Sequence, residues 1–121
     1  MAETVLVVDD SPTDTHLICN ALMSAGYSTL TVGTAEEAIQ VAKDEKPNAI
    51  LMDVVMPGQN GFQATRKLHN DPDTANIPII IVSSKNKASD KVWGMRQGAV
   101  GYITKPFSQT ELLDKLREIT Q

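Results

Sequence analysis

The chain has 121 residues and a formal net charge of −4 at neutral pH, with 41% hydrophobic and 21% charged residues. This length suits one globular domain, and the acidic balance argues against general affinity for nucleic acid. The apolar runs are too short to cross a bilayer, and the first residues lack the pattern of a signal peptide. We therefore expect one domain over residues 1–121, located in the cytoplasm and without membrane insertion.

The first apolar run, Val5–Val8, predicts a buried strand that leads directly into Asp9 and Asp10. Ser11-Pro12 then places a capping serine before a proline that suits the first helical turn. A helix is expected from there to about Gly26, because glycine commonly follows the end of a helix.

The next unit repeats this order of strand and helix. Ser28–Val32 predicts a strand, and the capping box Thr34–Glu37 predicts the start of a helix that ends at Pro47. A third predicted strand, Ala49–Met52, leads into Asp53. An acidic side chain therefore follows the first and the third strand directly.

The middle of the chain holds a turn-rich segment, Met56–Gly61, followed by a helix expected from about Phe62 to His69. A connection from Pro72 to Pro78 precedes the fourth apolar run. That run, Ile79–Val82, predicts a strand that ends at the hydroxyl side chains of Ser83-Ser84.

The last third begins with a helix expected from about Ser89 to Gln97, and a strand over Tyr102–Thr104 that leads into Lys105-Pro106. The capping box Ser108–Glu111 predicts the start of the final helix. The apolar face of this helix consists of Leu112, Leu113, Leu116 and Ile119.

This alternation predicts an α/β fold of the (βα)5 type, a five-stranded parallel sheet with helices on both faces. The continuous apolar runs indicate strands that are buried on both faces. In such a sheet the carboxyl ends of the strands share one edge, where ligands bind. The side chains expected to meet at this edge are Asp9, Asp10, Asp53, Ser83 and Lys105.

Three carboxylates in one depression repel one another unless a cation joins them. Magnesium takes oxygen ligands and fits this set of side chains, whereas we find no loop spacing typical of calcium. Beside a bound cation, Asp53 is the better candidate for a nucleophile toward phosphorus, because it stands alone next to the turn-rich loop. Lys105 would pair with the phosphoryl group, and the Ser83 hydroxyl would donate a hydrogen bond to it.

Each of these residues also has an ordinary explanation when it is taken singly. Asp10 could help to cap the following helix, Ser83 could begin a turn, and Lys105 could be an exposed surface lysine. The occurrence of all of them at four strand ends on one edge favours a common site.

These residues, in this order, resemble the CheY-like receiver domain of two-component response regulators over essentially the whole chain. The matching segments are Val7–Ser11, Leu51–Gly58, Asn60-Gly61, Val82–Ser84 and Lys105–Phe107. The resemblance implies a flavodoxin-like fold with the strand order 2-1-3-4-5, which the sequence pattern alone does not determine. It also implies that Asp53 accepts a phosphoryl group from the phosphohistidine of a histidine kinase. The magnesium ligands that it implies are Asp9, Asp10, Asp53 and the Val55 carbonyl.

The resemblance further implies a switch, in which Ser83 and Lys105 sense the phosphoryl group and Tyr102 turns inward as Ser83 moves. Serine at position 83 replaces the commoner threonine of the family and keeps its hydroxyl. A protein partner would bind the face formed by the helix 89–97, the strand 102–104 and the final helix. Such a protein is a signalling switch rather than an enzyme, and the absence of an evident apolar dimer patch favours a monomer.

A narrower resemblance links the chain to stand-alone regulators of type IV pilus twitching motility, the PilH type. It rests on Ser11–Thr13, Met56–Arg66, Lys91–Gly94 and Arg96–Ala99. We expect no output domain after Gln121, and we therefore expect the signal to leave through a protein partner in twitching motility or a chemotaxis-like pathway.

Three alternatives remain at this stage. The protein could be a phosphate sink for a shared kinase. It could be a phosphatase with an aspartyl nucleophile, although Val55 stands where such enzymes usually carry a second acid. It could also bind a nucleotide, but the loops after the first two strands lack a glycine-rich phosphate cradle.

Overall fold

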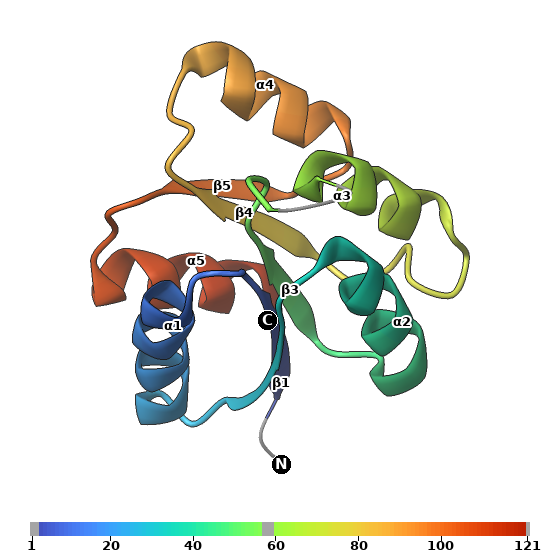
Figure 1. Ribbon diagram of the computed structural model, residues 1–121. Coiled ribbons are helices and arrows are strands. Elements are labelled where there is room, and N and C mark those ends of the chain that lie inside the picture. Colours follow the sequence, from blue (N-terminus) through green and yellow to red (C-terminus); the bar gives the residue numbers. More distant parts are fainter. Residues whose placement is uncertain (1–2, 57–59, 121) are drawn as a thin grey trace.

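The computed structural model describes residues 3–56 and 60–120 as alternating strands and helices (Figure 1). The strands are β1 (Thr4–Val8), β2 (Ser28–Val32), β3 (Ala49–Met52), β4 (Ile79–Ser83) and β5 (Gly101–Thr104). The helices are α1 (Pro12–Ser24), α2 (Ala35–Glu45), α3 (Gly61–Asn70), α4 (Ala88–Arg96) and α5 (Gln109–Thr120). Residues Pro57, Gly58 and Gln59 of the predicted turn-rich segment lie outside the described residues.

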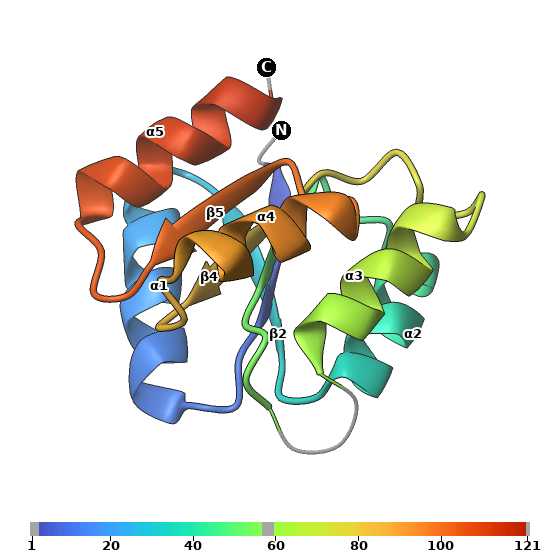
Figure 2. The ribbon, with the colours of Figure 1, turned by 90° about the horizontal axis from the view of Figure 1, so that it is seen from above.

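All five strands form one parallel sheet in the order β2-β1-β3-β4-β5. Helices α1 and α5 cover one face, and α2, α3 and α4 cover the other (Figure 2). This arrangement confirms the predicted flavodoxin-like (βα)5 fold. The reversal of strand order falls between β1 and β3, which is where ligands bind in open α/β sheets.

The core lies in two layers on either side of the sheet, because successive side chains of a strand point to opposite faces. Val5 and Val7 of β1 pack with α1 and α5, whereas Leu6 and Val8 pack with α2 and α3. Strands β3 and β4 are buried along their whole length, as predicted from their continuous apolar runs.

Strand β5 differs from that prediction, because it lies at the edge of the sheet and pairs with β4. Gly101 and Ile103 are buried, but Tyr102 and Thr104 are only half-buried. The short run was expected to be buried on both faces, and its edge position explains why one face is more open.

Most helix starts agree with the predicted caps. The Ser11 hydroxyl accepts the Asp14 N–H at 3.3 Å, the Thr34 hydroxyl accepts the Glu37 N–H at 3.2 Å, and the Ser108 hydroxyl accepts the Glu111 N–H at 3.0 Å. Helix α3 begins one residue earlier than expected, because the Asn60 side chain accepts the Gln63 N–H at 2.9 Å and caps it. In residues 3–56 and 60–120, no helix is long and apolar enough to cross a membrane.

Candidate functional site

Backbone hydrogen bonds continue past the strand ends and hold three of the predicted residues at one edge of the sheet. The Asp9 N–H donates to the Val32 carbonyl at 3.1 Å, and the Asp53 N–H donates to the Val8 carbonyl at 2.9 Å. The Lys105 N–H donates to the Ser83 carbonyl at 2.9 Å. The parallel sheet therefore brings together residues that are almost 100 positions apart in the chain, as Lys105 and Asp9 are 96 apart.

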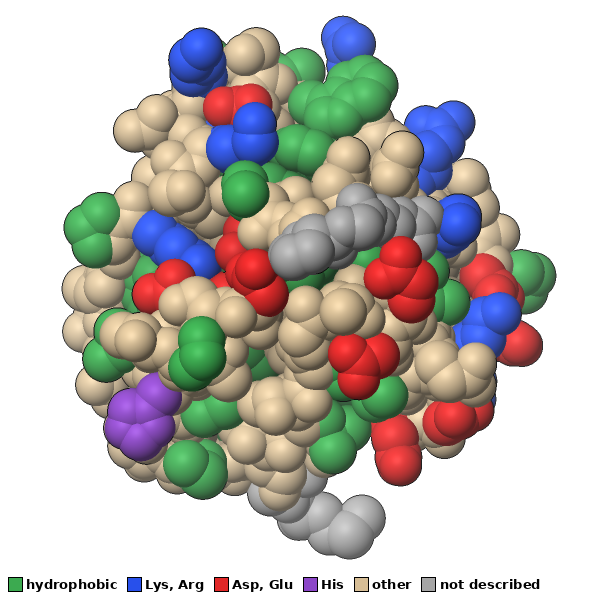
Figure 3. Space-filling view, in the orientation of Figure 1, with side chains coloured by type: hydrophobic (Ala, Val, Ile, Leu, Met, Phe, Trp, Pro, Cys, Tyr) green, Lys and Arg blue, Asp and Glu red, His purple; other side chains and the backbone are tan. Residues whose placement is uncertain are grey.

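The three predicted acids form one cluster at this edge. One carboxylate oxygen from each of Asp9, Asp10 and Asp53 lies within 4.8 Å of the other two. Asp9 and Asp53 are buried, whereas Asp10 is exposed. Figure 3 shows acidic side chains gathered near the middle of this face. The donor set is all oxygen with one water-accessible member, which fits a magnesium ion that keeps part of its hydration shell.

Local backbone groups orient the two buried carboxylates. The Ser11 N–H donates to Asp9 Oδ1 at 2.9 Å, and the Val55 N–H donates to Asp53 Oδ1 at 3.1 Å. In both acids the other oxygen, Oδ2, contacts the Lys105 ammonium group instead. Thr15 supports the same turn, because its hydroxyl donates to the Asp9 carbonyl at 3.4 Å.

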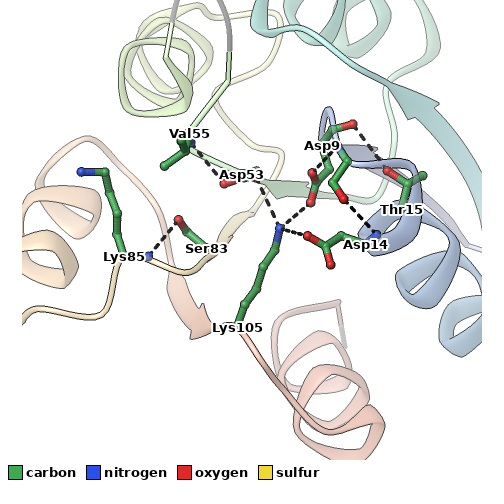
Figure 4. Close-up of polar contacts among 9 residues, drawn as sticks. Asp9, Asp14, Thr15, Asp53, Val55, Ser83, Lys85 and Lys105 are labelled. Carbon is green, nitrogen blue, oxygen red and sulfur yellow. Dashed lines mark hydrogen bonds and ion pairs between the residues drawn. The ribbon is translucent and has the colours of Figure 1, made fainter.

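Lys105 supplies positive charge to the cluster (Figure 4). Its Nζ atom lies 2.7 Å from Asp9 Oδ2, 2.9 Å from Asp14 Oδ2 and 3.4 Å from Asp53 Oδ2. The ammonium thus neutralises part of the charge that a divalent cation would meet. The peptide bond between Lys105 and Pro106 is cis.

The electrostatics follow from this crowding. Burial raises the pKa of Asp53 above its usual value, and the charge of Asp9 adds to this, while the Val55 N–H and Lys105 oppose it. Burial alone would lower the pKa of Lys105, but its hydrogen bonds to Asp9 and Asp14 and the nearby carboxylate charges outweigh burial and raise it. Lys105 therefore stays charged at neutral pH.

Asp14 is the member of this group that the sequence analysis did not identify. It lies in the first turn of α1, where an acid is common for helix stability alone. The sequence did hold one indication that Asp14 lies near the site, because a helix that follows β1 begins at the same sheet edge as Asp9. Only the structure shows that the Asp14 side chain turns toward Lys105.

Ser83 and Tyr102 are joined through one residue of the loop after β4. The buried Ser83 hydroxyl accepts the Lys85 N–H at 3.3 Å, and the Tyr102 hydroxyl donates to the Lys85 carbonyl at 2.7 Å. Burial, with a smaller contribution from Asp90, raises the pKa of Tyr102, so its hydroxyl remains a donor at neutral pH. The ring packs in a small cluster with Val54, Ile81, Ala99 and Phe62.

Known sequences resemble this chain over most of its length. The response regulator receiver domain model matches residues 5–117. The chain is 45% identical to "Protein PilH" of Pseudomonas aeruginosa over 115 residues, which cover 95% of both chains. It is also 39% identical to "Phosphate regulon transcriptional regulatory protein PhoB" of the same species, covering 98% of this chain and 52% of that protein.

Solved structures with the same fold include a putative response regulator from Chloroflexus aurantiacus, with a TM-score of 0.95, 31% identity and coverage of 99% of this chain and 98% of the other. The receiver domain of the sensor histidine kinase PA1611 from Pseudomonas aeruginosa has a TM-score of 0.92 and 28% identity, with coverage of 99% and 98%. That structure is described as having a magnesium ion coordinated in its active-site cleft.

Proposed function

The chain belongs to the response regulator receiver domain family, and from this premise we propose that it is a phosphorylation switch whose phosphoryl acceptor is Asp53. The observation that carries the proposal is the position of Asp53, whose carboxylate is buried between two other acids and Lys105. Family membership gives a signalling role, and the site geometry supports the assignment of the individual residues.

The side chains at the edge supply what phosphoryl transfer to a carboxylate requires. Asp9, Asp10, Asp53 and the Val55 carbonyl would hold a magnesium ion, which supplies positive charge for the oxygens of the phosphoryl group. The Asp53 Oδ2 atom, which does not accept the Val55 N–H, would attack phosphorus while the bond between phosphorus and the imidazole nitrogen of the donor's phosphohistidine breaks and the imidazole leaves. Lys105 would contribute a second positive charge at the same place.

The output would pass from Ser83 to α4. Movement of the Ser83 hydroxyl toward a phosphoryl group would break its bond to the Lys85 N–H, and the Lys85 carbonyl also holds Tyr102. Phosphorylation therefore favours a different arrangement of the loop before α4. A protein target on the face of α4, β5 and α5 would read that change.

The phosphoryl donor would be a histidine kinase in the cytoplasm. The similarity to PilH favours a role in twitching motility or in a chemotaxis-like pathway. In this proposal the protein acts as a monomer, with a single receiver domain over residues 1–121. A phosphate sink would use the same site but would have no target on the face of α4.

The experiment is a comparison of backbone amide NMR spectra with and without magnesium and beryllofluoride, a mimic of the phosphoryl group. In the wild type we expect shifts at the site and along α4 and β5. Ser83→Ala should keep the shifts around Asp53 and lose those of α4, whereas Ser84→Ala, a neighbouring exposed hydroxyl, should behave as the wild type. Equal α4 shifts in Ser83→Ala would contradict the proposed route.

A further inference from the structure

Lys105 is shared among three carboxylates, and the contact with Asp14 is shorter than the contact with Asp53. The distances from Nζ are 2.9 Å to Asp14 Oδ2 and 3.4 Å to Asp53 Oδ2. Figure 4 shows Asp14 reaching the ammonium group from the side of α1, and Asp53 from the side of β3. The lysine is therefore drawn away from the proposed phosphoryl acceptor by a residue of another element.

We propose that Asp14 is a positioning residue that holds the Lys105 ammonium in a resting place and competes with the phosphoryl group on Asp53 for it. An ammonium group has three N–H donors, and three carboxylates contact this one. A phosphoryl oxygen can gain a strong hydrogen bond from Lys105 only when one of these contacts is released.

Burial indicates which contact is released. The Asp9 side chain is 1% exposed and that of Asp53 is 10% exposed, whereas that of Asp14 is 36% exposed. A carboxylate that loses its partner at a buried position stays without hydration, but one at an exposed position binds water instead. The Asp14 contact is therefore the one that opens at least cost.

The turn that carries Asp14 is fixed independently of Lys105. The Asp14 N–H donates to the Ser11 hydroxyl, and the Ser11 N–H donates to Asp9 Oδ1. Release of Lys105 would therefore leave the backbone of this turn in place and free only the side chain. Asp14 thus affects which carboxylates hold the Lys105 ammonium group, and it does not affect the fold of α1.

This inference rests on the proposed function and predicts opposite effects on two ligands. In Asp14→Asn the ammonium would be held more firmly by Asp9 and Asp53, where it competes with a cation, so magnesium should bind about two- to fivefold more weakly. Beryllofluoride at saturating magnesium should bind about two- to fivefold more tightly, because Asp14 no longer competes for Lys105 and one negative charge near the anion is removed.

The experiment measures both affinities, with magnesium binding by calorimetry and beryllofluoride binding by fluorine NMR at saturating magnesium. Asp14→Glu keeps the charge and should restore values close to the wild type. Glu37→Gln is the matched control, because it removes one charge from an exposed side chain that lines the same surface groove as Asp9 and Asp10. It should weaken magnesium only slightly and should not tighten beryllofluoride.

The inference would be overturned if Asp14→Asn changed the affinities for magnesium and beryllofluoride in the same direction. It would also be overturned if both affinities of Asp14→Asn equalled those of Glu37→Gln. Both results leave Asp53 as phosphoryl acceptor untouched. If the wild type itself bound no beryllofluoride, the proposed function would fail first, and the competition at Lys105 would fail with it.

Discussion

At the scale of single residues, the site depends on a balance of charge that Lys105 maintains. Its ammonium contacts Asp9, Asp14 and Asp53 while its own side chain is 14% exposed. Partly buried carboxylates without a partner repel one another and lack hydration. The absence of this one cation should therefore affect both the stability of the fold and the binding of other cations.

Lys105→Ala should lower the free energy of unfolding by about 1–3 kcal/mol in the absence of magnesium, because it leaves buried carboxylates unpaired. Magnesium should bind this variant at least as tightly as the wild type, since its competitor is removed. Urea denaturation with and without magnesium measures both effects. Lys115→Ala, which breaks an exposed ion pair with Glu118 on α5, should change stability by less than about 1 kcal/mol. An equal loss in both variants would show that Lys105 is an ordinary surface lysine.

The raised pKa of Asp53 predicts how stability depends on pH. Folding favours the protonated form of this carboxyl, so its contribution to stability is complete below the unfolded pKa of about 3.9 and is lost as the pH rises through the higher folded pKa. In Asp53→Asn this position has no carboxyl group to titrate. In magnesium-free buffer the wild type should therefore become less stable relative to this variant as the pH rises from about 4 to 7. A stability difference that moves the other way would contradict the assigned pKa shift.

At the scale of elements, the start of α3 is held against the backbone beside Asp53. A Cβ atom at Gly61 would overlap the Asp53 carbonyl oxygen and lie 2.7 Å from Val54 Cα. Only a glycine permits this approach, which sets the distance between α3 and the end of β3. The dipeptide Asn60-Gly61 thus combines a helix cap with a close backbone contact.

Gly61→Ala should destabilise the protein by about 1–3 kcal/mol, because the backbone at position 61 and the backbone of Asp53 and Val54 must move apart. It should also weaken beryllofluoride binding, since the shift falls on Asp53. Gly33→Ala provides the control, because a Cβ atom there has no atom within 4 Å. Thermal unfolding and beryllofluoride titration of both variants measure the difference. Equal behaviour would show that α3 can move without disturbing the site.

Elements also show how far the sequence could predict the structure. The runs at Val5–Val8, Ala49–Met52 and Ile79–Val82 gave their strands directly, because full burial leaves a continuous apolar signature. The order of strands came from the resemblance and not from the pattern, since alternation is compatible with several orders. The half-burial of β5 follows from its edge position, which no local pattern of Tyr102–Thr104 encodes.

The candidate site could be predicted from the sequence only in part. Asp9, Asp10 and Asp53 were identifiable because strand ends share one edge, and their carboxylates do meet there. Asp14 was not identified, because its side-chain direction depends on how α1 packs against β1 and α5. The bonds of Lys85 to Ser83 and Tyr102 also depend on a loop conformation that has no sequence signature.

At the scale of the whole molecule, the fold places one acidic edge at the point where strand order reverses. A ligand that binds only the folded state stabilises it in proportion to the logarithm of its concentration. Magnesium at ten times its dissociation constant should therefore raise the free energy of unfolding by about 1.4 kcal/mol, and chelation should reverse this. Asp9→Asn should lose most of the effect. An equal gain in that variant would place the ion elsewhere.

The central claim is that Asp53 accepts a phosphoryl group. It is tested most directly by intact mass spectrometry after incubation with acetyl phosphate, with and without magnesium, for the wild type and Asp53→Asn. We predict one phosphoryl adduct on the wild type that requires magnesium and is absent from the variant. An adduct of equal yield on Asp53→Asn, or a wild type that gains no adduct and also binds no beryllofluoride, would contradict the account.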